Sequence, residues 1–196
     1  MKKSHTGPLW DVLDRRVVYK ADPWMEVALE TVETDSGHVV KDYHQLTLPD
    51  FVVVVAETVN EKVICLRQYK HGLRDVSLTF PGGMVDKGEP PINAVQRELL
   101  EETGYAAPTW HHLGSFTVHG NLGAGRGHFF SARGAFAART PASGDLESMA
   151  LELKSWKDMS HCAAAGEVKL LYHIAALRLA APHGLLFTPI TSRAAQ

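Results

Sequence analysis

The chain of 196 residues is 45 % hydrophobic and 21 % charged, values that are ordinary for a globular protein with one main domain. Its formal net charge of −2 excludes a strong overall field for nucleic acid, so an anionic ligand would need a local site. No segment approaches the roughly 20 apolar residues of a membrane span, and no apolar run follows the basic start, so we expect neither an anchor nor a signal peptide. Cys65 and Cys162 are far apart, which favours a reduced, cytoplasmic protein over a disulfide framework.

The first part of the chain is predicted to form β-strands. Residues 16–20 are short and β-branched, and residues 24–32 alternate loosely between apolar and polar. Residues 39–48 follow the turn at Asp35-Ser36-Gly37. Strands that are joined by such short turns are typical of an antiparallel arrangement.

A second group of strands leads to the centre of the chain. An uninterrupted apolar run over residues 51–56 predicts a strand that is buried on both faces. The turn Asn60-Glu61 separates this run from residues 62–69, so we expect the two segments to form a hairpin. Residues 77–80 form a further short strand, which ends at the breaker Pro81-Gly82-Gly83.

Residues 90–103 are predicted to form a helix. Two prolines suit its first turn, where a missing N–H costs nothing, and Gly104 suits the position after its last turn. Residues 110–118 and 127–136 then read as strands, and residues 155–163 and 168–181 as helices. This order favours an α/β or α+β layered domain with a mixed sheet.

The predicted central helix carries three closely spaced acids. Glu98, Glu101 and Glu102 fall at i, i+3 and i+4, so their carboxylates share one face. Like charges so close repel one another unless a cation neutralises them, and a few carboxylate oxygens suit Mg²⁺ that also binds substrate phosphates. For three glutamates alone, a solvated acidic helix surface is the more ordinary explanation.

Two neighbouring features change that balance. The turn Pro81-Gly82-Gly83 brings bare backbone toward the same helix, so a carbonyl group there could join a metal shell. Glu89 at the start of the helix and Arg97 beside the carboxylates are spaced so that an ion pair could lock the loop onto the helix.

The segment from Gly83 to Tyr105 resembles the Nudix box. Seven of its matching positions require a single residue type, which makes the motif specific, and only the aromatic Tyr105 departs from the usual aliphatic residue. The matching residues are Gly83, Glu89, Arg97, Glu98, Leu99, Glu101, Glu102, Gly104 and Tyr105.

The resemblance continues outside the box. Residues 51–56 and 63–70 look like the leading strands of ADP-ribose pyrophosphatase-like members, and the first strands resemble the N-terminal β-domain with which such members dimerise. The resemblance implies a Nudix fold, with a mixed β-sheet sandwiched by helices and an N-terminal antiparallel β-extension. It implies a homodimer whose chains have an extension at residues 1–48, a Nudix domain at residues 49–185 and a tail at residues 186–196.

The same resemblance implies roles for the box residues. Glu98 and Glu102 are the main ligands of Mg²⁺, or of Mn²⁺ as an alternative, and Glu101 is a further or second-layer ligand. The carbonyl group of Gly82 joins them. Arg97 and Glu89 orient the catalytic helix, while Gly83 and Gly104 are structural.

Three residues outside the box complete the expected site. Glu147 is the carboxylate expected from a later acidic loop, as a metal ligand or a base. Lys70 stands where the subgroup often has an arginine that reaches the substrate phosphates. Arg126 could contact a phosphate or a ribose, although an exposed loop arginine explains its presence more simply.

The expected activity is Mg²⁺-dependent hydrolysis of the pyrophosphate bond of a nucleoside diphosphate derivative, with ADP-ribose or a related nucleotide sugar as the leading candidate. ADP-ribose pyrophosphatases tend to have a proline where this chain has Asn121, so other substrates stay open. These are a dinucleoside polyphosphate, NADH or an oxidised nucleotide. A third alternative is a non-catalytic nucleotide-sensing module, but such modules usually lose box carboxylates that are all present here.

Other features carry less weight. Four histidines, at positions 111, 112, 119 and 128, gather around two predicted strands without the spacing of a zinc site. The glycine-rich residues 123–127 neither open a helix nor carry the Lys-Ser/Thr pair of a P-loop. Trp24 could stack on a nucleobase, although tryptophans more often belong to a core.

Overall fold

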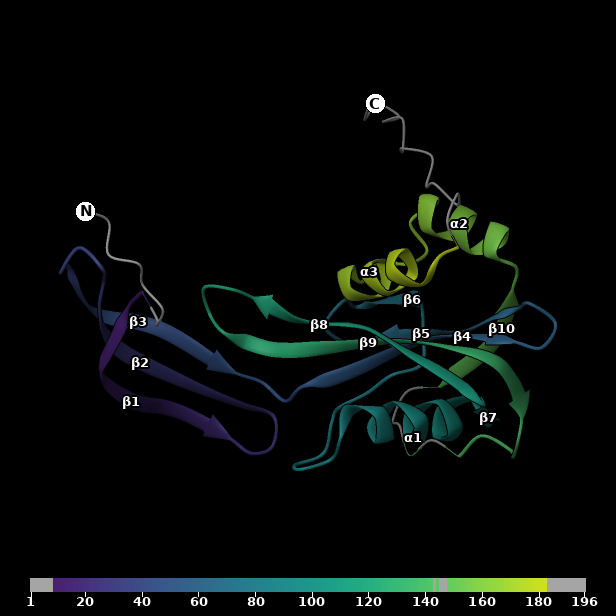
Figure 1. Cartoon of the computed structure of the whole chain (residues 1–196), viewed down its shortest axis with the longest axis horizontal. Coiled ribbons are helices and arrows are strands. Elements are labelled where there is room, and N and C mark those ends of the chain that lie inside the picture. The colour runs from purple at the N-terminus through teal and green to yellow at the C-terminus, as the bar shows by residue number, and fades with distance from the viewer. Residues whose placement is uncertain (1–8, 143, 145–147, 183–196) are drawn as a thin grey trace. The chain divides into compact units, whose positions relative to one another are not determined.

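The computed structural model describes residues 9–142, 144 and 148–182, which divide into two compact units (Figure 1). Unit 1 comprises the residues up to Asp50 together with Phe116–Arg126. Unit 2 comprises Phe51–Ser115 and the residues from Gly127 onward. The division crosses two long strands, β8 (Thr109–His119) and β9 (Ala124–Ala137).

Unit 1 is built on a three-stranded antiparallel sheet in the order β1-β2-β3. Its strands are β1 (Asp11–Ala21), β2 (Met25–Glu33) and β3 (Val39–Thr47). The sequence predicted a strand over residues 16–20, whereas strand β1 begins five residues earlier, at Asp11. Its first half contains Arg15, whose guanidinium donates to Glu26 at 2.7 Å and contacts Glu30 at 3.2 Å across the sheet. Cross-strand ion pairs of this kind offset a low strand propensity.

The loop between β8 and β9 is held against β3 within the same unit. The backbone N–H of Leu46 donates to the carbonyl oxygen of Leu122 at 2.8 Å. The side-chain amide of Gln45 donates to the carbonyl oxygen of Asn121 at 3.0 Å. These contacts explain why residues 116–126, far along the chain, belong to unit 1.

Unit 2 is built on a seven-stranded mixed sheet. The order is β10-β5-β4-β9-β7, with β6 paired to β5 and β8 paired to β9. Strand β4 runs parallel to β9, while β5 is antiparallel to its three neighbours. The pairing of Glu57 with Val63 confirms the predicted hairpin. The remaining bounds are β4 (Phe51–Thr58), β5 (Val63–Lys70), β6 (Asp75–Thr79), β7 (Tyr105–Ala106) and β10 (Met149–Lys154).

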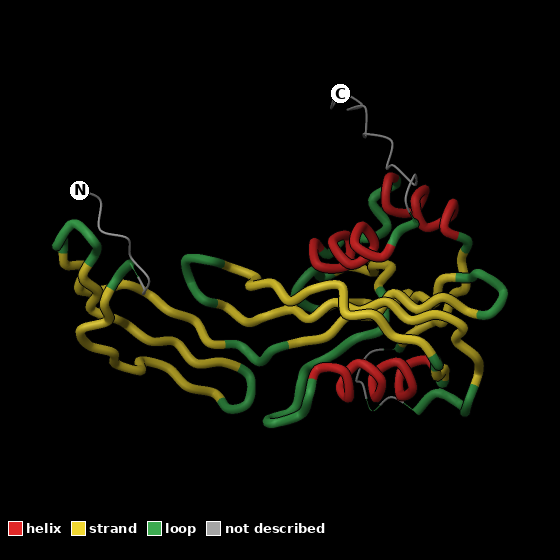
Figure 2. Tube along the Cα trace, in the orientation of Figure 1, coloured by secondary structure: helices red, strands yellow, loops and turns green. Residues whose placement is uncertain are grey.

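Helices cover both faces of this sheet (Figures 1 and 2). Helix α1 (Pro91–Thr103) packs on one face, and α2 (Trp156–Ala164) and α3 (Leu171–Ala180) pack on the other. Val52 and Val54 belong to the core cluster of α1, whereas Val53 and Val55 belong to the cluster of α2 and α3. Because successive residues of β4 face opposite cores, the strand is apolar throughout, which confirms the predicted sandwich.

Strand β10 was missed by the sequence prediction. Met149, Leu151 and Leu153 alternate with less apolar residues, which is the period of a strand. The pairing of Leu151 with Leu66 sets its register on β5. The strand has only six residues and lies at the edge of the sheet. Because a polar loop precedes it, so short an alternation did not indicate a strand.

The helices were predicted to within a few residues. Helix α2 begins with a capping box, in which Ser155 Oγ accepts a hydrogen bond from the backbone N–H of Asp158 at 3.1 Å. Helix α3 begins three residues later than the predicted start at residue 168. Within the described residues, no helix is long and apolar enough to cross a membrane.

Candidate active site

Helix α1 places four charged side chains beside the loop that precedes it. Pro90 caps the helix in an extended conformation, and Pro91 occupies its first position, where a proline has no N–H to lose. The helix ends at Gly104, which has a φ of 74° and donates to Leu100 O at 3.0 Å. These ends fix the register in which Arg97 and the three glutamates follow one another.

Arg97 joins the loop to the acidic face of the helix. Its guanidinium donates to both oxygens of Glu89, at 3.2 and 3.1 Å. It also donates to Glu98 at 2.7 Å and to Glu101 at 3.3 Å, and to the carbonyl oxygen of Met84 at 3.2 Å. The hydrogen bonds from Arg97 hold the pKa of Glu89 below its ordinary value. One planar cation therefore orders the loop and partly neutralises the acids.

Glu102 is the most buried of the three glutamates. Its residue is only 8 % exposed, and its carboxylate accepts a hydrogen bond from the backbone N–H of Gly82 at 2.8 Å. A Cβ atom on Gly82 would collide with the carbonyl oxygen of Val52, so only glycine fits this close approach to β4. The carboxylate is thereby fixed to the backbone of the loop.

Glu98 rests on the next glycine. A Cβ atom on Gly83 would overlap the Glu98 carboxylate, so the missing side chain creates the space in which that carboxylate lies. The carbonyl oxygens of Gly83 and Pro81 accept hydrogen bonds from Val52 and Val54, each at 2.9 Å. The loop is thus held beside β4 like an additional strand, and it presents a rigid surface to α1.

These contacts argue against a merely solvated acidic surface. The side chain of Glu98 is 14 % exposed and that of Glu89 17 %, whereas that of Glu101 is 39 % exposed. Three of the four box carboxylates, those of Glu89, Glu98 and Glu102, therefore give up most of their hydration, which is costly unless charge and hydrogen bonds replace it. The ion pair that the sequence predicted between Arg97 and Glu89 is present and partly exposed, since 31 % of the arginine side chain is accessible.

The donor set fits a hard divalent cation that is bound by few protein ligands. Its members are carboxylate oxygens from one helix face and backbone from a glycine loop, and such sites leave positions for water and for substrate phosphates. In the part of the chain that the structure describes, no three His, Cys, Asp or Glu side chains are drawn together as a complete metal cage. That finding covers neither backbone oxygens nor Glu147, which lies outside the described residues.

A pocket lies beside the glycine loop. It has a volume of about 280 Å³, and Gly82 and Gly83 form part of its wall together with Lys70. His173 and Tyr172, from α3, also line it, although the sequence analysis did not single them out. A histidine on an apolar helix is ordinarily a core residue, so only its position beside a pocket identifies it. The remaining lining residues are Phe51, Val52, Val53, Gln68, Phe80 and Met84.

Two other residues considered in the sequence analysis lie in unit 1. The backbone N–H of Arg126 donates to Asp50 at 3.0 Å, and the arginine is exposed. Trp24 is 60 % exposed at the turn between β1 and β2. The predicted histidine cluster is partly connected in unit 2, where Ser115 Oγ lies 2.9 Å from His112 Nε2 and 2.7 Å from His128 Nδ1.

Comparison with known proteins identifies the family. Residues 47–161, more than half of the chain, match the model of the NUDIX domain. The chain belongs to the Nudix family. Its resemblance to the Nudix box is therefore confirmed, and the box residues are those that gather between α1 and the glycine loop.

The relatives that the chain resembles differ in their named activities. The chain is 35 % identical over 83 residues to an ADP-ribose pyrophosphatase of Bacillus subtilis (strain 168), which is 42 % of this chain and 44 % of that protein. It is 30 % identical over 109 residues to a methanol dehydrogenase activator of Bacillus methanolicus. That match covers 56 % of this chain and 56 % of that protein. The chain thus spans about half the length of these relatives.

A solved structure shares the fold over nearly the whole chain. A crystal structure of an ADP compounds hydrolase superposes with a TM-score of 0.77, covering 90 % of this chain and 94 % of that one, at 20 % identity. The likeness confirms the Nudix fold, with its mixed sheet and its helices on both faces.

Proposed function

We propose that this Nudix protein hydrolyses the pyrophosphate bond of a nucleoside diphosphate derivative in a reaction that depends on Mg²⁺. The observation that carries the proposal is the fixed position of Glu98 and Glu102. Both carboxylates are mostly buried, and both rest on the glycine loop rather than extending into solvent. Carboxylates that are held in this way beside one arginine are positioned to bind a divalent cation.

Each residue of the cluster has a defined part in the proposal. Glu98 and Glu102 hold the ion, with Glu101 and the carbonyl oxygen of Gly82 as further ligands, and Mn²⁺ is an alternative ion. Bound Mg²⁺ would neutralise the pyrophosphate and lower the pKa of an attacking water. Arg97 acts through the carboxylates, because its hydrogen bonds to Glu98 and Glu101 keep their spacing.

Residues outside the box are proposed to bind the substrate and to take the proton from the attacking water. Lys70, in the wall of the pocket beside the glycine loop, supplies positive charge for a phosphate. Glu147 is proposed as the loop carboxylate that takes the proton from water or adds to the metal ligands. Arg126 is a further candidate for contact with a phosphate or a ribose.

ADP-ribose or a related nucleotide sugar is the proposed substrate class. Hydrolysis of ADP-ribose would give AMP and ribose 5-phosphate. The named activities of relatives support this class, since they include an ADP-ribose pyrophosphatase of Bacillus subtilis (strain 168) and an ADP-sugar pyrophosphatase of Mus musculus, the latter 33 % identical over 87 residues. That match covers 44 % of this chain and 36 % of the mouse protein.

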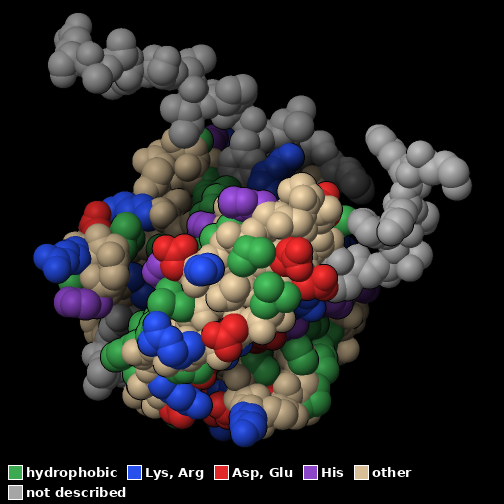
Figure 3. Space-filling model, turned by 90° about the vertical axis from the view of Figure 1, so that its left-hand side faces the viewer, with side chains coloured by type: hydrophobic (Ala, Val, Ile, Leu, Met, Phe, Trp, Pro, Cys, Tyr) green, Lys and Arg blue, Asp and Glu red, His purple; other side chains and the backbone are tan. Residues whose placement is uncertain are grey.

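We propose further that unit 1 forms a homodimer interface. Strand β1 lies at the edge of its sheet, and ten of its eleven residues are exposed. Val12, Leu13 and Tyr19 are each at least 55 % exposed, an unusual apolar content for a strand that faces water. A second copy of the chain would cover such a strand. Figure 3 shows one face of the molecule, on which hydrophobic side chains lie between basic and acidic ones.

A panel of substrates tests the proposed activity. ADP-ribose, GDP-mannose, UDP-glucose, NADH and diadenosine polyphosphates are each incubated with Mg²⁺ or with EDTA, and products are identified by chromatography. We expect cleavage of ADP-ribose to AMP and ribose 5-phosphate with Mg²⁺ alone. Cleavage of only another member would move the substrate assignment, and no cleavage by the folded protein would favour a nucleotide-sensing module.

A further inference from the structure

The pocket beside the glycine loop contains a histidine that the box chemistry does not use. His173 is 4 % exposed, and its Nδ1 accepts a hydrogen bond from the backbone N–H of Phe80 at 3.2 Å. A nitrogen that accepts this bond carries no proton, so a neutral ring carries its proton on Nε2. The backbone of Phe80 thus selects one tautomer of His173.

The ring stays neutral because of its surroundings. Burial, and then the positive charge of Lys70, lower the pKa of His173 from 6.5 to about 3. At neutral pH the side chain is therefore a hydrogen-bond donor without a charge.

The donating nitrogen has access to the pocket. Among the described residues, Nε2 of His173 has no hydrogen-bond partner, and no fully buried side-chain nitrogen or oxygen lacks one. Because His173 lines the pocket, the pocket is where its Nε2–H could find an acceptor. Gln68 lines the same pocket, and its amide nitrogen is committed to Thr79 Oγ1 at 2.7 Å, which leaves its carbonyl oxygen as an acceptor.

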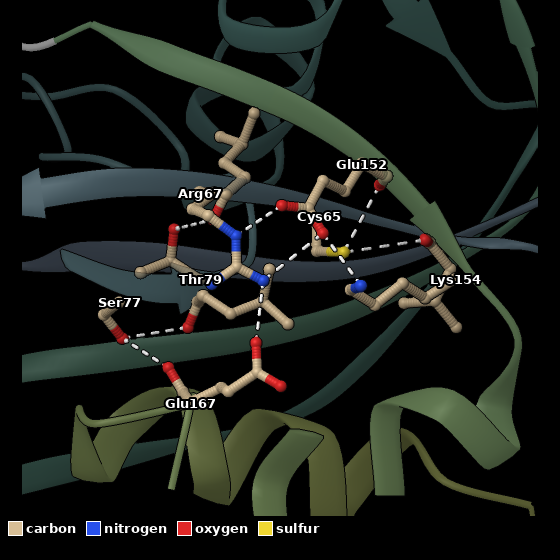
Figure 4. Close-up of polar contacts among 10 residues, drawn as sticks. Cys65, Arg67, Ser77, Thr79, Glu152, Lys154 and Glu167 are labelled. Atoms are coloured by element: carbon tan, nitrogen blue, oxygen red, sulfur yellow. Dashed lines mark hydrogen bonds and ion pairs between the residues drawn. The ribbon is translucent and has the colours of Figure 1, made fainter. Parts of the chain in front are cut away.

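Polar contacts fix the segment that leads into α3 (Figure 4). Arg67 of β5 lies between Glu152 of β10 and Glu167, and its bond to Glu167 measures 2.8 Å. The carbonyl oxygen of Glu167 accepts a hydrogen bond from the backbone N–H of Leu78 at 2.9 Å. Ser77 Oγ accepts a further bond from the backbone N–H of Lys169 at 3.0 Å. The chain that enters α3 is therefore fixed to β6, as a preorganised binding residue requires.

Resting on the proposed function, we infer that His173 donates an Nε2–H hydrogen bond to the sugar-phosphate half of the substrate and so contributes to substrate specificity. The pocket offers a neutral donor, the ammonium of Lys70 and the acceptor of Gln68, a combination that suits hydroxyl and phosphate oxygens. It borders Gly82 and Gly83, against which the box carboxylates rest. Its volume of about 280 Å³ is just below the roughly 300–1,000 Å³ of drug-sized ligand sites, which suits half of a nucleotide sugar.

Binding of the two product halves tests the assignment. Ribose 5-phosphate and AMP are titrated separately into wild type and H173N by calorimetry with Mg²⁺ present. The asparagine oxygen can still accept the Phe80 N–H, but its amide nitrogen lies one bond closer to the helix than Nε2 and does not reach the position of the pocket donor. We expect about tenfold weaker binding of ribose 5-phosphate, a loss of about one hydrogen bond to a charged group, and an unchanged affinity for AMP. Unchanged binding of ribose 5-phosphate, or an equal loss for AMP, would overturn the inference.

A second measurement uses the wild-type protein and does not depend on the variant's folding. The Nε2–H resonance of His173 is followed by nitrogen-edited NMR while ribose 5-phosphate or AMP is added. The inference predicts a shift with ribose 5-phosphate only, and no shift, or a shift with AMP only, contradicts it.

Turnover of ADP-ribose separates this inference from the proposed function. If wild type hydrolyses ADP-ribose but ribose 5-phosphate leaves the His173 resonance unmoved, only the assignment of His173 fails. If ribose 5-phosphate moves the resonance but no substrate is hydrolysed, the proposed activity fails and the pocket assignment stands. In kinetics, H173N should raise KM for ADP-ribose about tenfold and change kcat by less than about threefold.

Discussion

The carboxylate of Glu102 accepts a hydrogen bond from the backbone N–H of Gly82 at 2.8 Å, across 20 positions of the chain. This bond joins the helix that carries the acids to the loop that borders the pocket. It also gives a buried carboxylate a donor in place of water. The proposed chemistry depends on this contact between loop and helix.

Substitution of Gly83 by alanine should displace Glu98. The new Cβ would overlap the Glu98 carboxylate, whose flexible end must move away. Because a displacement on the order of 1 Å can cost about a hundredfold in rate, we expect kcat for ADP-ribose to fall by about that factor. The matched control is Gly72→Ala, where a Cβ meets nothing within 4 Å and the backbone is not left-handed. Equal rates for the two variants would contradict the role of Gly83.

Replacement of Arg97 by lysine keeps the charge but removes the paired hydrogen bonds to Glu89. We expect the free energy of unfolding to fall by about 2 kcal/mol and kcat to fall about tenfold. Arg15→Lys is the control, because Arg15 also bridges two carboxylates and its side chain is 39 % exposed against 31 % for Arg97. In urea denaturation, the Arg15→Lys change should lower the midpoint less than the Arg97→Lys change does, because exposed ion pairs contribute little to stability. An equal loss of stability in the two variants would contradict the proposed role of the Arg97–Glu89 hydrogen bonds.

Charged residues on β1 should separate the proposed dimer. Val12 and Val18 are 57 % and 44 % exposed, and lysines at both positions would bring like charges together at the interface. Light scattering after size exclusion should give a dimer for wild type and a monomer for the double variant. Val59→Lys, at a valine that is 69 % exposed in unit 2, should leave the mass unchanged. A monomeric wild type would reject the dimer.

Acid should destabilise the protein through His173. The pKa of this side chain falls from 6.5 to about 3 on folding, so between these values the unfolded chain binds a proton that the native chain does not. Stability must therefore decrease as the pH falls through this window, by up to about 1.4 kcal/mol per pH unit. H173N lacks this proton and should show a correspondingly flatter curve in urea denaturation at pH values from 7 to 4. Parallel curves would show that His173 is not buried in its neutral form.

Local patterns in the sequence were sufficient for α1 and the box. The prolines, the glutamate spacing and Gly104 predicted a helix over residues 90–103, and the helix spans Pro91–Thr103. The alternation of core faces along β4 followed from its continuous apolar run. These features depend on neighbours within a few residues, which one sequence displays directly.

Contacts between residues that are far apart in the sequence could not be predicted from such local patterns. The Phe80–His173 hydrogen bond joins residues 93 positions apart, and no local pattern indicates it. Strand β10 gains its register only from pairing with β5. The inclusion of residues 116–126 in unit 1 likewise depends on β3. The burial of Glu102 was also hidden, because helical periodicity placed it with the exposed acids.

The rate of ADP-ribose hydrolysis by E102Q, at saturating Mg²⁺, tests the central claim most directly. Glutamine retains an oxygen that accepts the Gly82 N–H but lacks the charge that holds a cation. We predict that kcat falls about a thousandfold, which corresponds to about 4 kcal/mol in the barrier, with little change in thermal stability. E61Q, at an exposed turn residue, should match wild type. A rate for E102Q within tenfold of wild type would contradict the account.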